Sequence, residues 1–289
     1  MLVESSNRFI KLCEFQFDLL AFLKFYSNRH SILFNVRPLR PIQVHSPPTY
    51  GAYPTNFIKK CRFGDSKCII ESMNAVIKRY PRGLAAMGMK PIDNVDIKDS
   101  EIWNNAEVGG VWFKFKLFNQ VNYGFENATI TRIKGFGRDP TASTMEIHGR
   151  IPSLIHKGSY IANGRVWLIA LNATGESTSD FQNLRFVLKL KVIPEYRNNK
   201  RYLKIYELVP IVNISRWIVW LDTLFPENMD LTITLNEVLN ANWLEFWNEL
   251  EPAFLSVFSS VFTGMIEDIF HKISYDDMFL KDNETEINY

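Results

Sequence analysis

The sequence has almost no excess charge of either sign, with 33 lysines and arginines against 31 aspartates and glutamates. Proteins that bind nucleic acid carry a concentrated basic face, whereas basic and acidic residues are interspersed along this chain. We therefore expect no nucleic-acid partner. Long uncharged runs are also missing from the C-terminal half, where Pro252 to Ile266 is shorter than the roughly 18 to 20 residues that cross a bilayer. We expect no transmembrane segment.

Catalytic and metal-binding motifs are scarce as well. No Gly-x-Ser-x-Gly elbow occurs, and Gly135-Phe136-Gly137 has no third glycine at dinucleotide-binding spacing. Gly64-Asp65-Ser66 is similar to the start of a serine-hydrolase motif but lacks its following leucine, so we interpret it as a helix cap. His148 lies on a predicted strand, where it either meets the polar end of a ligand or is an ordinary sheet-face residue. We expect no metal, no cofactor and no enzymatic activity, because the histidines are scattered without zinc spacing: His30, His45, His148, His156 and His271.

Cysteine is rare, with only Cys13, Cys61 and Cys68 in the chain. From the residues alone, Cys61 and Cys68 form a disulfide or are two free thiols in a cytosolic protein. Asn-x-Ser/Thr sequons, which are glycosylated only in the secretory pathway, modestly favour secretion. These glycosylation candidates are Asn127, Asn172, Asn213 and Asn283.

The N-terminal extension, residues 1–53, does not resemble an ordinary leader. Its apolar run from Phe15 to Tyr26 is interrupted by Asp18 and Lys24, so residues 1–50 do not form a clean signal peptide. The segment is an atypical leader, an uncleaved or disordered extension, or a start upstream of the true one. We assign residues 54–280 to a single domain and residues 281–289 to a disordered tail.

Apolar spacing predicts the elements of this domain. A helix is expected over Gly64 to Tyr80, with Asp65 or Ser66 as its N-cap and Pro81 ending it. From Val111 to Leu224 apolar residues alternate with polar ones, which indicates six or more antiparallel strands with one apolar face each. Turn signals separate these strands at Asn163-Gly164, Asn172 to Gly175 and Arg197 to Lys200.

An apolar stripe with helical spacing returns after Asp230 and extends from Leu235 to Ile273. Pro252 either kinks this helix or begins a second one. Since a sheet with one apolar face must cover something, we expect an α+β fold in which a strongly curved antiparallel sheet wraps around the long C-terminal helix.

Six short segments occur in a fixed order between about Pro54 and Leu280. They are Lys60-Cys61 with Gly64 to Cys68, Met89 to Asn94, Val121 to Gly124, Ile151-Pro152 with Lys157 to Tyr160, Leu239 to Trp243, and Tyr275 to Phe279. In this order the chain resembles the juvenile hormone-binding/takeout proteins of insects. The resemblance implies a curved sheet around a long helix, similar to half of a bactericidal/permeability-increasing protein, with an elongated apolar tunnel. The unconventional N-terminus and Cys13 depart from the family.

The resemblance also implies roles for particular residues. Cys61 and Cys68 would form the family's short disulfide, which stabilises by roughly 2 to 3 kcal/mol in the chain-entropy model, and Cys13 would be removed or unpaired. Aromatic residues at helical or alternating spacing are core or tunnel lining. We expect the tunnel lining to include Phe113, Phe115, Leu117, Trp167, Phe186, Leu188, Trp243, Trp247, Phe254 and Phe258.

The function expected from these observations is extracellular binding and transport of a small hydrophobic ligand, terpenoid, juvenile hormone-like or fatty-acid-like, by a secreted monomer. The alternative is a membrane-surface module that transfers lipids. It would show exposed apolar residues or a basic rim at the tunnel mouth, whereas a carrier would show a closed channel.

Overall fold

The computed structural model describes residues 58–104, 111–166 and 169–281. Residues 1–53, the tail from residue 282, Cys13, Trp167 and Asn283 therefore lie outside the described residues, as does the side chain of Phe113. The predicted extension and tail stay predictions.

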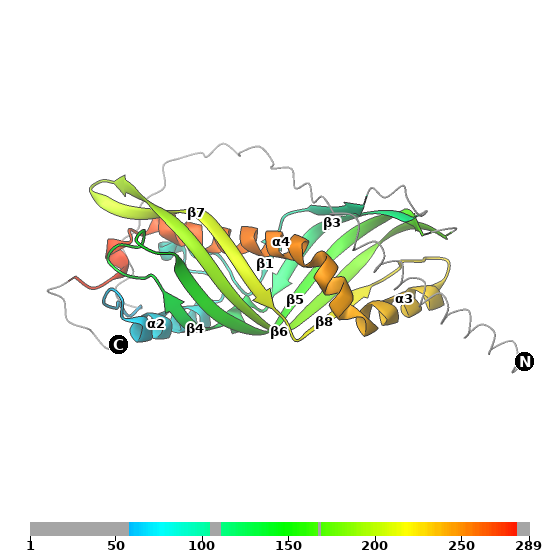
Figure 1. Cartoon of the computed structure of the whole chain (residues 1–289), viewed down its shortest axis with the longest axis horizontal. Helices are drawn as coiled ribbons and strands as arrows, with labels where there is room; N and C mark the ends of the chain where they lie inside the picture. Colours follow the sequence, from blue (N-terminus) through cyan, green and yellow to red (C-terminus); the bar gives the residue numbers. More distant parts are fainter. Residues whose placement is uncertain (1–57, 105–110, 167–168, 282–289) are drawn as a thin grey trace, which may run out of the picture.

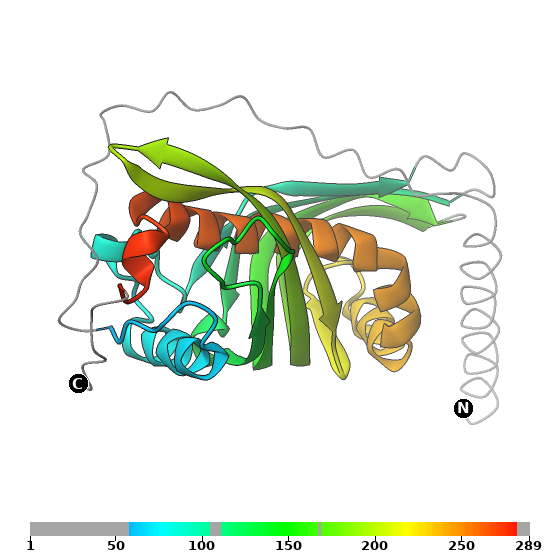
Figure 2. The same ribbon diagram turned by 60° about the vertical axis from the view of Figure 1, so that its left-hand side comes forward.

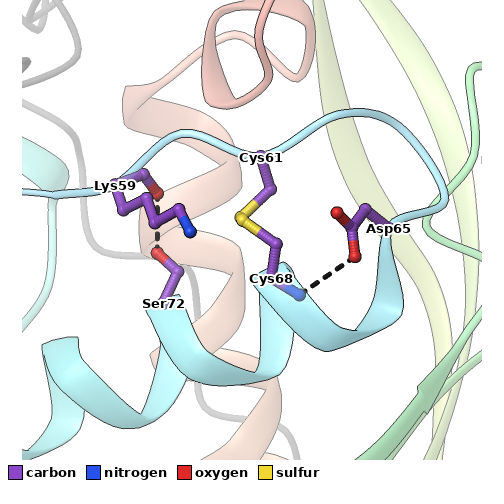
Figure 3. The surroundings of a disulfide bond; sticks show 5 residues. All are labelled: Lys59, Cys61, Asp65, Cys68 and Ser72. Carbon is purple, nitrogen blue, oxygen red and sulfur yellow. Dashed lines mark hydrogen bonds between the residues drawn. A yellow bond between two sulfur atoms is a disulfide. The ribbon is translucent and has the colours of Figure 1, made fainter. Parts of the chain in front are cut away.

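The first described helix, α2 (Ser66–Arg79), begins where the sequence predicts. The Asp65 carboxylate accepts a hydrogen bond from the Cys68 backbone N–H at 3.1 Å, which satisfies one of the unpaired donors of the first turn. A Cys61–Cys68 disulfide joins the preceding segment to this turn, and the Ser72 hydroxyl donates to the Lys59 carbonyl at 2.8 Å (Figure 3). The start of α2 is thus fixed by a cap and a covalent bond.

One antiparallel sheet of eight strands makes up most of the molecule (Figure 1). Its central path is β1-β3-β5-β6-β7, with β2 paired to β3, β4 to β5 and β8 to β6. Short 3-10 helices cover Ala85–Met87, Phe125–Asn127 and Asp276–Met278. The strands are β1 (Val95–Ile97), β2 (Ser100–Asn104), β3 (Val111–Tyr123), β4 (Thr129–Lys134), β5 (Met145–Val166), β6 (Ile169–Arg197), β7 (Lys200–Asn213) and β8 (Arg216–Leu221).

Two of the three predicted turns lie inside long strands. Asn163-Gly164 belongs to β5 and Asn172 to Gly175 to β6, because the β5–β6 ladder continues through Asn163↔Asn172 to Val166↔Ile169. The turn predicted at Arg197 to Lys200 is confirmed. Its central residues, Asn198 and Asn199, have φ values of 51° and 60°, as a type I′ hairpin requires.

Two asparagines adopt left-handed backbone conformations inside long strands. Asn119 in β3 has φ 50° and Asn183 in β6 has φ 49°. Around Asn183 the buried residues Phe181 and Leu184 are three positions apart, so the inward-facing set changes phase there. Such irregularities let the sheet curve around the helix that it covers (Figure 2).

The C-terminal apolar stripe forms two helices, α3 (Met229–Ala241) and α4 (Trp243–Lys272), not one continuous helix. The break falls at Asn242, and Pro252 lies inside α4. The Asn242 side chain donates to the Val238 carbonyl at 2.9 Å, competing with the backbone of the last turn of α3. From this break α4 extends along the inner side of the sheet, against β7 and β8 (Figures 1 and 2).

Side chains of α3 form hydrogen bonds with the backbone groups at the free edge of β8. The Asn236 and Asn240 amides each accept from and donate to one residue of β8, Leu221 and Val219 respectively, at 2.7 to 2.9 Å. Asparagines four positions apart on a helix lie on one face, so they match alternate residues of the strand. An edge strand whose backbone groups are occupied is protected from pairing with another chain.

The expectation of no membrane-length stretch needs a correction. Within the described residues, Leu250–Lys272 of α4 is 23 residues long with a mean hydropathy of 1.4, long and apolar enough to cross a bilayer. This stretch is missed when only residues between charged positions are counted, whereas mean hydropathy tolerates a few charges. A single stretch of this kind is a weak indication of a span, since core helices of soluble proteins have the same composition.

Candidate ligand-binding interior

Two apolar clusters occupy the inner side of the sheet. The larger, here the disulfide-end cluster, joins Cys61, Cys68 and α2 to the inner residues of β4–β8 and to α4. The smaller, the α3-end cluster, consists of Tyr160, Ala162, Leu171, Ala173 and Leu224. Residues that pack against the α3-end cluster while staying partly buried include Phe115, Leu117, Leu221, Phe225 and Leu235.

An aromatic cluster lies where α4 meets β6 and β8. Phe181 is at its centre, with ring centroids 5.3 to 6.2 Å from those of its four neighbours, Trp217, Trp247, Phe254 and Phe258. Trp247 and Phe254 are also stacked at 5.4 Å. Rings in these offset and edge-on arrangements attract one another beyond their area burial.

The apolar side chains of α4 are less covered than those of the strands. Only 17 % of the residues in the apolar window of Leu250–Lys272 are buried, although the apolar residues of this stretch pack against the disulfide-end cluster. Partly buried examples are Leu250, Phe254, Leu255, Val261, Met265 and Ile269. A helix beside a curved sheet that leaves apolar surface uncovered offers contact area to an apolar guest.

Comparison with known proteins identifies the family. The family model for haemolymph juvenile hormone binding protein (JHBP) matches residues 43–280. The chain belongs to this family. Two relatives are the circadian clock-controlled proteins daywake of Drosophila yakuba, 20 % identical over 77 % of this chain and 86 % of the relative, and of Drosophila melanogaster, 19 % identical over 78 % and 88 %.

A solved structure supports the same fold. Takeout 1 of Epiphyas postvittana matches with a TM-score of 0.64 and 19 % identity, covering 76 % of this chain and 98 % of that one. The predicted α+β class, a curved antiparallel sheet wrapped around a C-terminal helix, is confirmed. At this identity the likeness concerns the fold alone.

The residues predicted to line the interior of this JHBP-family chain lie in the aromatic cluster, elsewhere in or against the disulfide-end cluster, or against the α3-end cluster. Phe186, Leu188, Trp247 and Phe258 are buried, while Trp243 and Phe254 are partly buried, all in or against the disulfide-end cluster. Phe115 and Leu117 are partly buried against the α3-end cluster.

Phe186 packs directly on a glycine of the neighbouring strand. A Cβ atom built on Gly149, its cross-strand partner, would lie 2.4 Å from the Phe186 ring. The ring therefore covers the glycine directly, leaving no space for a ligand between them.

Of the two interpretations of His148, the structure supports the ordinary sheet-face residue, and a different histidine of β5 lies on the inner face. His148 lies on the outer face of β5, where its Nε2 is 3.0 Å from Glu146 Oε2 and this hydrogen bond lowers the pKa of Glu146. His156 lies on the inner face, with Nδ1 2.8 Å from Asn122 Oδ1. Burial lowers the pKa of His156 to about 4, so its ring is neutral at physiological pH. The signal that could have found it is its spacing of two from the buried Leu154.

Trp217 is a second polar feature that the sequence did not indicate. Its indole is 5 % exposed, and Nε1 has no hydrogen-bond partner among the described residues. Within the same residues, no group of three or more His, Cys, Asp or Glu is placed to hold a metal ion. The two apolar clusters therefore dominate this interior, although buried polar side chains also lie on β3 and β6.

Proposed function

We propose that this chain is an extracellular carrier that binds a small hydrophobic ligand, terpenoid or fatty-chain, between the inner face of the sheet and α4. The observation that carries the proposal is the incompletely covered apolar surface of α4 beside the aromatic cluster, in a chain of the JHBP family. Burying about 400 Å² of ligand gains on the order of 10 kcal/mol, and immobilising the ligand costs several. Micromolar affinity is thus reachable without any catalytic group.

Secretion is supported by the covalent chemistry of the chain. The Cys61–Cys68 disulfide is typical of oxidising compartments. The described sequon asparagines, Asn127, Asn172 and Asn213, have exposed side chains and could carry glycans without disturbing the core. Intact-mass measurement of protein secreted from insect cells, before and after glycosidase treatment, reports both modifications together with the expected monomer.

The experiment for the carrier is native mass spectrometry of that secreted protein. We expect an additional mass from a copurified lipophile that disappears after organic extraction and returns when a long-chain alcohol or terpenoid is added. Variants at the predicted tunnel-lining residues are compared with the wild-type protein in the same titration. Repeated recovery of empty protein that takes up no apolar compound would contradict the proposal.

A second candidate, lipid transfer at a membrane surface, is favoured by one observation. Met229, Ile233 and Leu244, on α3 and the start of α4, are 54 %, 38 % and 51 % exposed. Exposed apolar side chains near one end of the interior could enter a bilayer surface. Cosedimentation with phosphatidylcholine vesicles tests this candidate, which predicts that replacing all three with serine abolishes vesicle binding and leaves ligand affinity unchanged.

A further inference from the structure

A band of polar side chains crosses the inner face of the sheet between the two apolar clusters. One row, set by the strand register, places Asn122 of β3, His156 of β5 and Ser179 of β6 side by side. The adjacent positions hold Gln120 and Ser177. Asn122, Gln120, Ser177 and Ser179 are at most 7 % exposed, and His156 is partly buried.

The band faces inward, as its neighbours on the same strands show. Leu154, two residues before His156, is fully buried at 0 % exposure, and Phe181, two residues after Ser179, is 2 % exposed in the aromatic cluster. Side chains two positions apart on a strand share a face. A polar band at this place interrupts an otherwise apolar surface.

Part of the band is satisfied within the protein. The Gln120 amide donates to the Lys98 carbonyl at 2.7 Å, and the Ser177 hydroxyl donates to the Gly158 carbonyl at 3.0 Å. His156 Nδ1 and Asn122 Oδ1 satisfy each other at 2.8 Å. For His156 Nε2 the described part of the chain provides no hydrogen-bond partner.

The protonation of His156 fixes what Nε2 can bind. A carbonyl oxygen only accepts, so the proton of the ring sits on Nδ1 and is donated to Asn122 Oδ1. Since burial holds the pKa of His156 near 4, the ring carries no second proton at neutral pH. Nε2 is then an acceptor on the inner face that no group of the described residues satisfies, so it is available to a donor of a ligand.

We propose that His156, held by Asn122 and flanked by Ser179, is the subsite that receives a hydroxyl group of an otherwise apolar ligand. The inference rests on the proposed carrier function and names the ligand chemistry within it. A hydroxyl donates to Nε2, whereas an ether or a hydrocarbon leaves Nε2 unpaired. An ionised carboxylate has no proton to donate and meets no cation in the band.

The test compares hexadecanol with hexadecyl methyl ether, which differ in one donor, by displacement of the apolar fluorescent probe N-phenylnaphthylamine. We expect the wild-type protein to bind the alcohol about 5- to 10-fold more tightly than the ether, the effect of one neutral hydrogen bond. H156F should remove this preference while changing ether affinity less than twofold. H156Q, which restores an acceptor, should recover part of it.

The matched control is H148F, on the outer face of the same strand, which should keep the full preference for the alcohol. Equal binding of alcohol and ether by the wild-type protein, or tighter binding of the ether, overturns the subsite and leaves the carrier function standing. A preference that survives in H156F also overturns it. If neither compound displaces the probe, the carrier function itself fails.

Discussion

At the disulfide end the chain is closed by cross-links of several kinds, whereas the α3 end is held by hydrogen bonds and small inner side chains. At the first, Phe63 stacks on Phe279 at 4.3 Å, Arg201 pairs with Asp276 at 2.6 Å, and the Leu280 N–H donates to the Cys61 carbonyl. At the second, asparagines of α3 hold β8, and Ala162 and Ala173 occupy the inner face. The difference teaches that stability is concentrated at one end and that the other has fewer large side chains filling it.

The largest expected effect is a difference in stability loss between the aromatic cluster and the α3 end. F181A removes the ring at the centre of the aromatic cluster and should lower the free energy of unfolding by about 3 to 5 kcal/mol. F115A, at a partly buried position of the α3 end, should cost only about 1 kcal/mol and weaken ligand binding more than stability. Urea unfolding and probe displacement measure both quantities. Equal stability losses would contradict the comparison.

Removing the disulfide comes next. The C61A/C68A double variant should lose about 2 to 3 kcal/mol, because the unfolded chain regains the entropy of an open loop. Ligand affinity should stay unchanged, since the bond lies at the first turn of α2. Chemical denaturation of the variant beside the wild-type protein, with titration of the same apolar probe, checks both. A fall in affinity as large as the fall in stability would place the ligand beside the disulfide, away from the aromatic cluster.

The stability of the fold should depend on pH because of His156, in the polar band between the two ends. The folded-state pKa of His156, about 4, lies below its ordinary value of 6.5, so the unfolded chain takes up the proton first as the pH falls. The stability contributed by neutral His156 is complete above pH 6.5 and is lost as the pH falls toward 4, with about 2 kcal/mol lost by pH 5. H156F, unfolded in urea at pH 7 and pH 5, should lack this component, while H148F should retain it.

The smallest expected effect comes from removing the hydroxyl of either of two buried tyrosines, one at each end, that donate to a backbone carbonyl. The Tyr275 hydroxyl donates to the Gly137 carbonyl at 2.9 Å at the disulfide end, and the Tyr160 hydroxyl donates to the Asp222 carbonyl at the α3 end. Burial raises the pKa of both, so both remain neutral donors. Y275F and Y160F should each cost about 1 kcal/mol, but only Y160F should alter ligand affinity. A change in ligand affinity with Y275F would contradict the proposed difference between the disulfide end and the α3 end.

Local chemistry made part of this structure predictable from the sequence. The cap at Asp65 and the stop at Pro81 define α2 within two residues, and the alternation of Phe186, Leu188 and Leu190 marks an inward-facing strand. Each depends on neighbours in sequence. The family resemblance gave the curved sheet around a helix and the pairing of Cys61 with Cys68.

Other features depended on register and were not predictable. The turns expected at Asn163-Gly164 and Asn172 to Gly175 were wrong, because asparagine and glycine are accommodated in a strand paired along its length. The helix breaks at Asn242 instead of Pro252 because a side chain competes for a backbone carbonyl. The contact of His156 with Asn122, 34 residues apart, exists only because β3 and β5 pair in one register.

The central claim, that the ligand lies between the inner face of the sheet and α4, is tested most directly by quenching of tryptophan fluorescence with a brominated long-chain alcohol. Trp217 and Trp247 are 5 % exposed in the aromatic cluster, whereas Trp220 is 45 % exposed on the outer face of β8. The account predicts saturable quenching that persists in W220F and falls sharply in W217F/W247F. Quenching that disappears in W220F, or that is unchanged in the double variant, would contradict it.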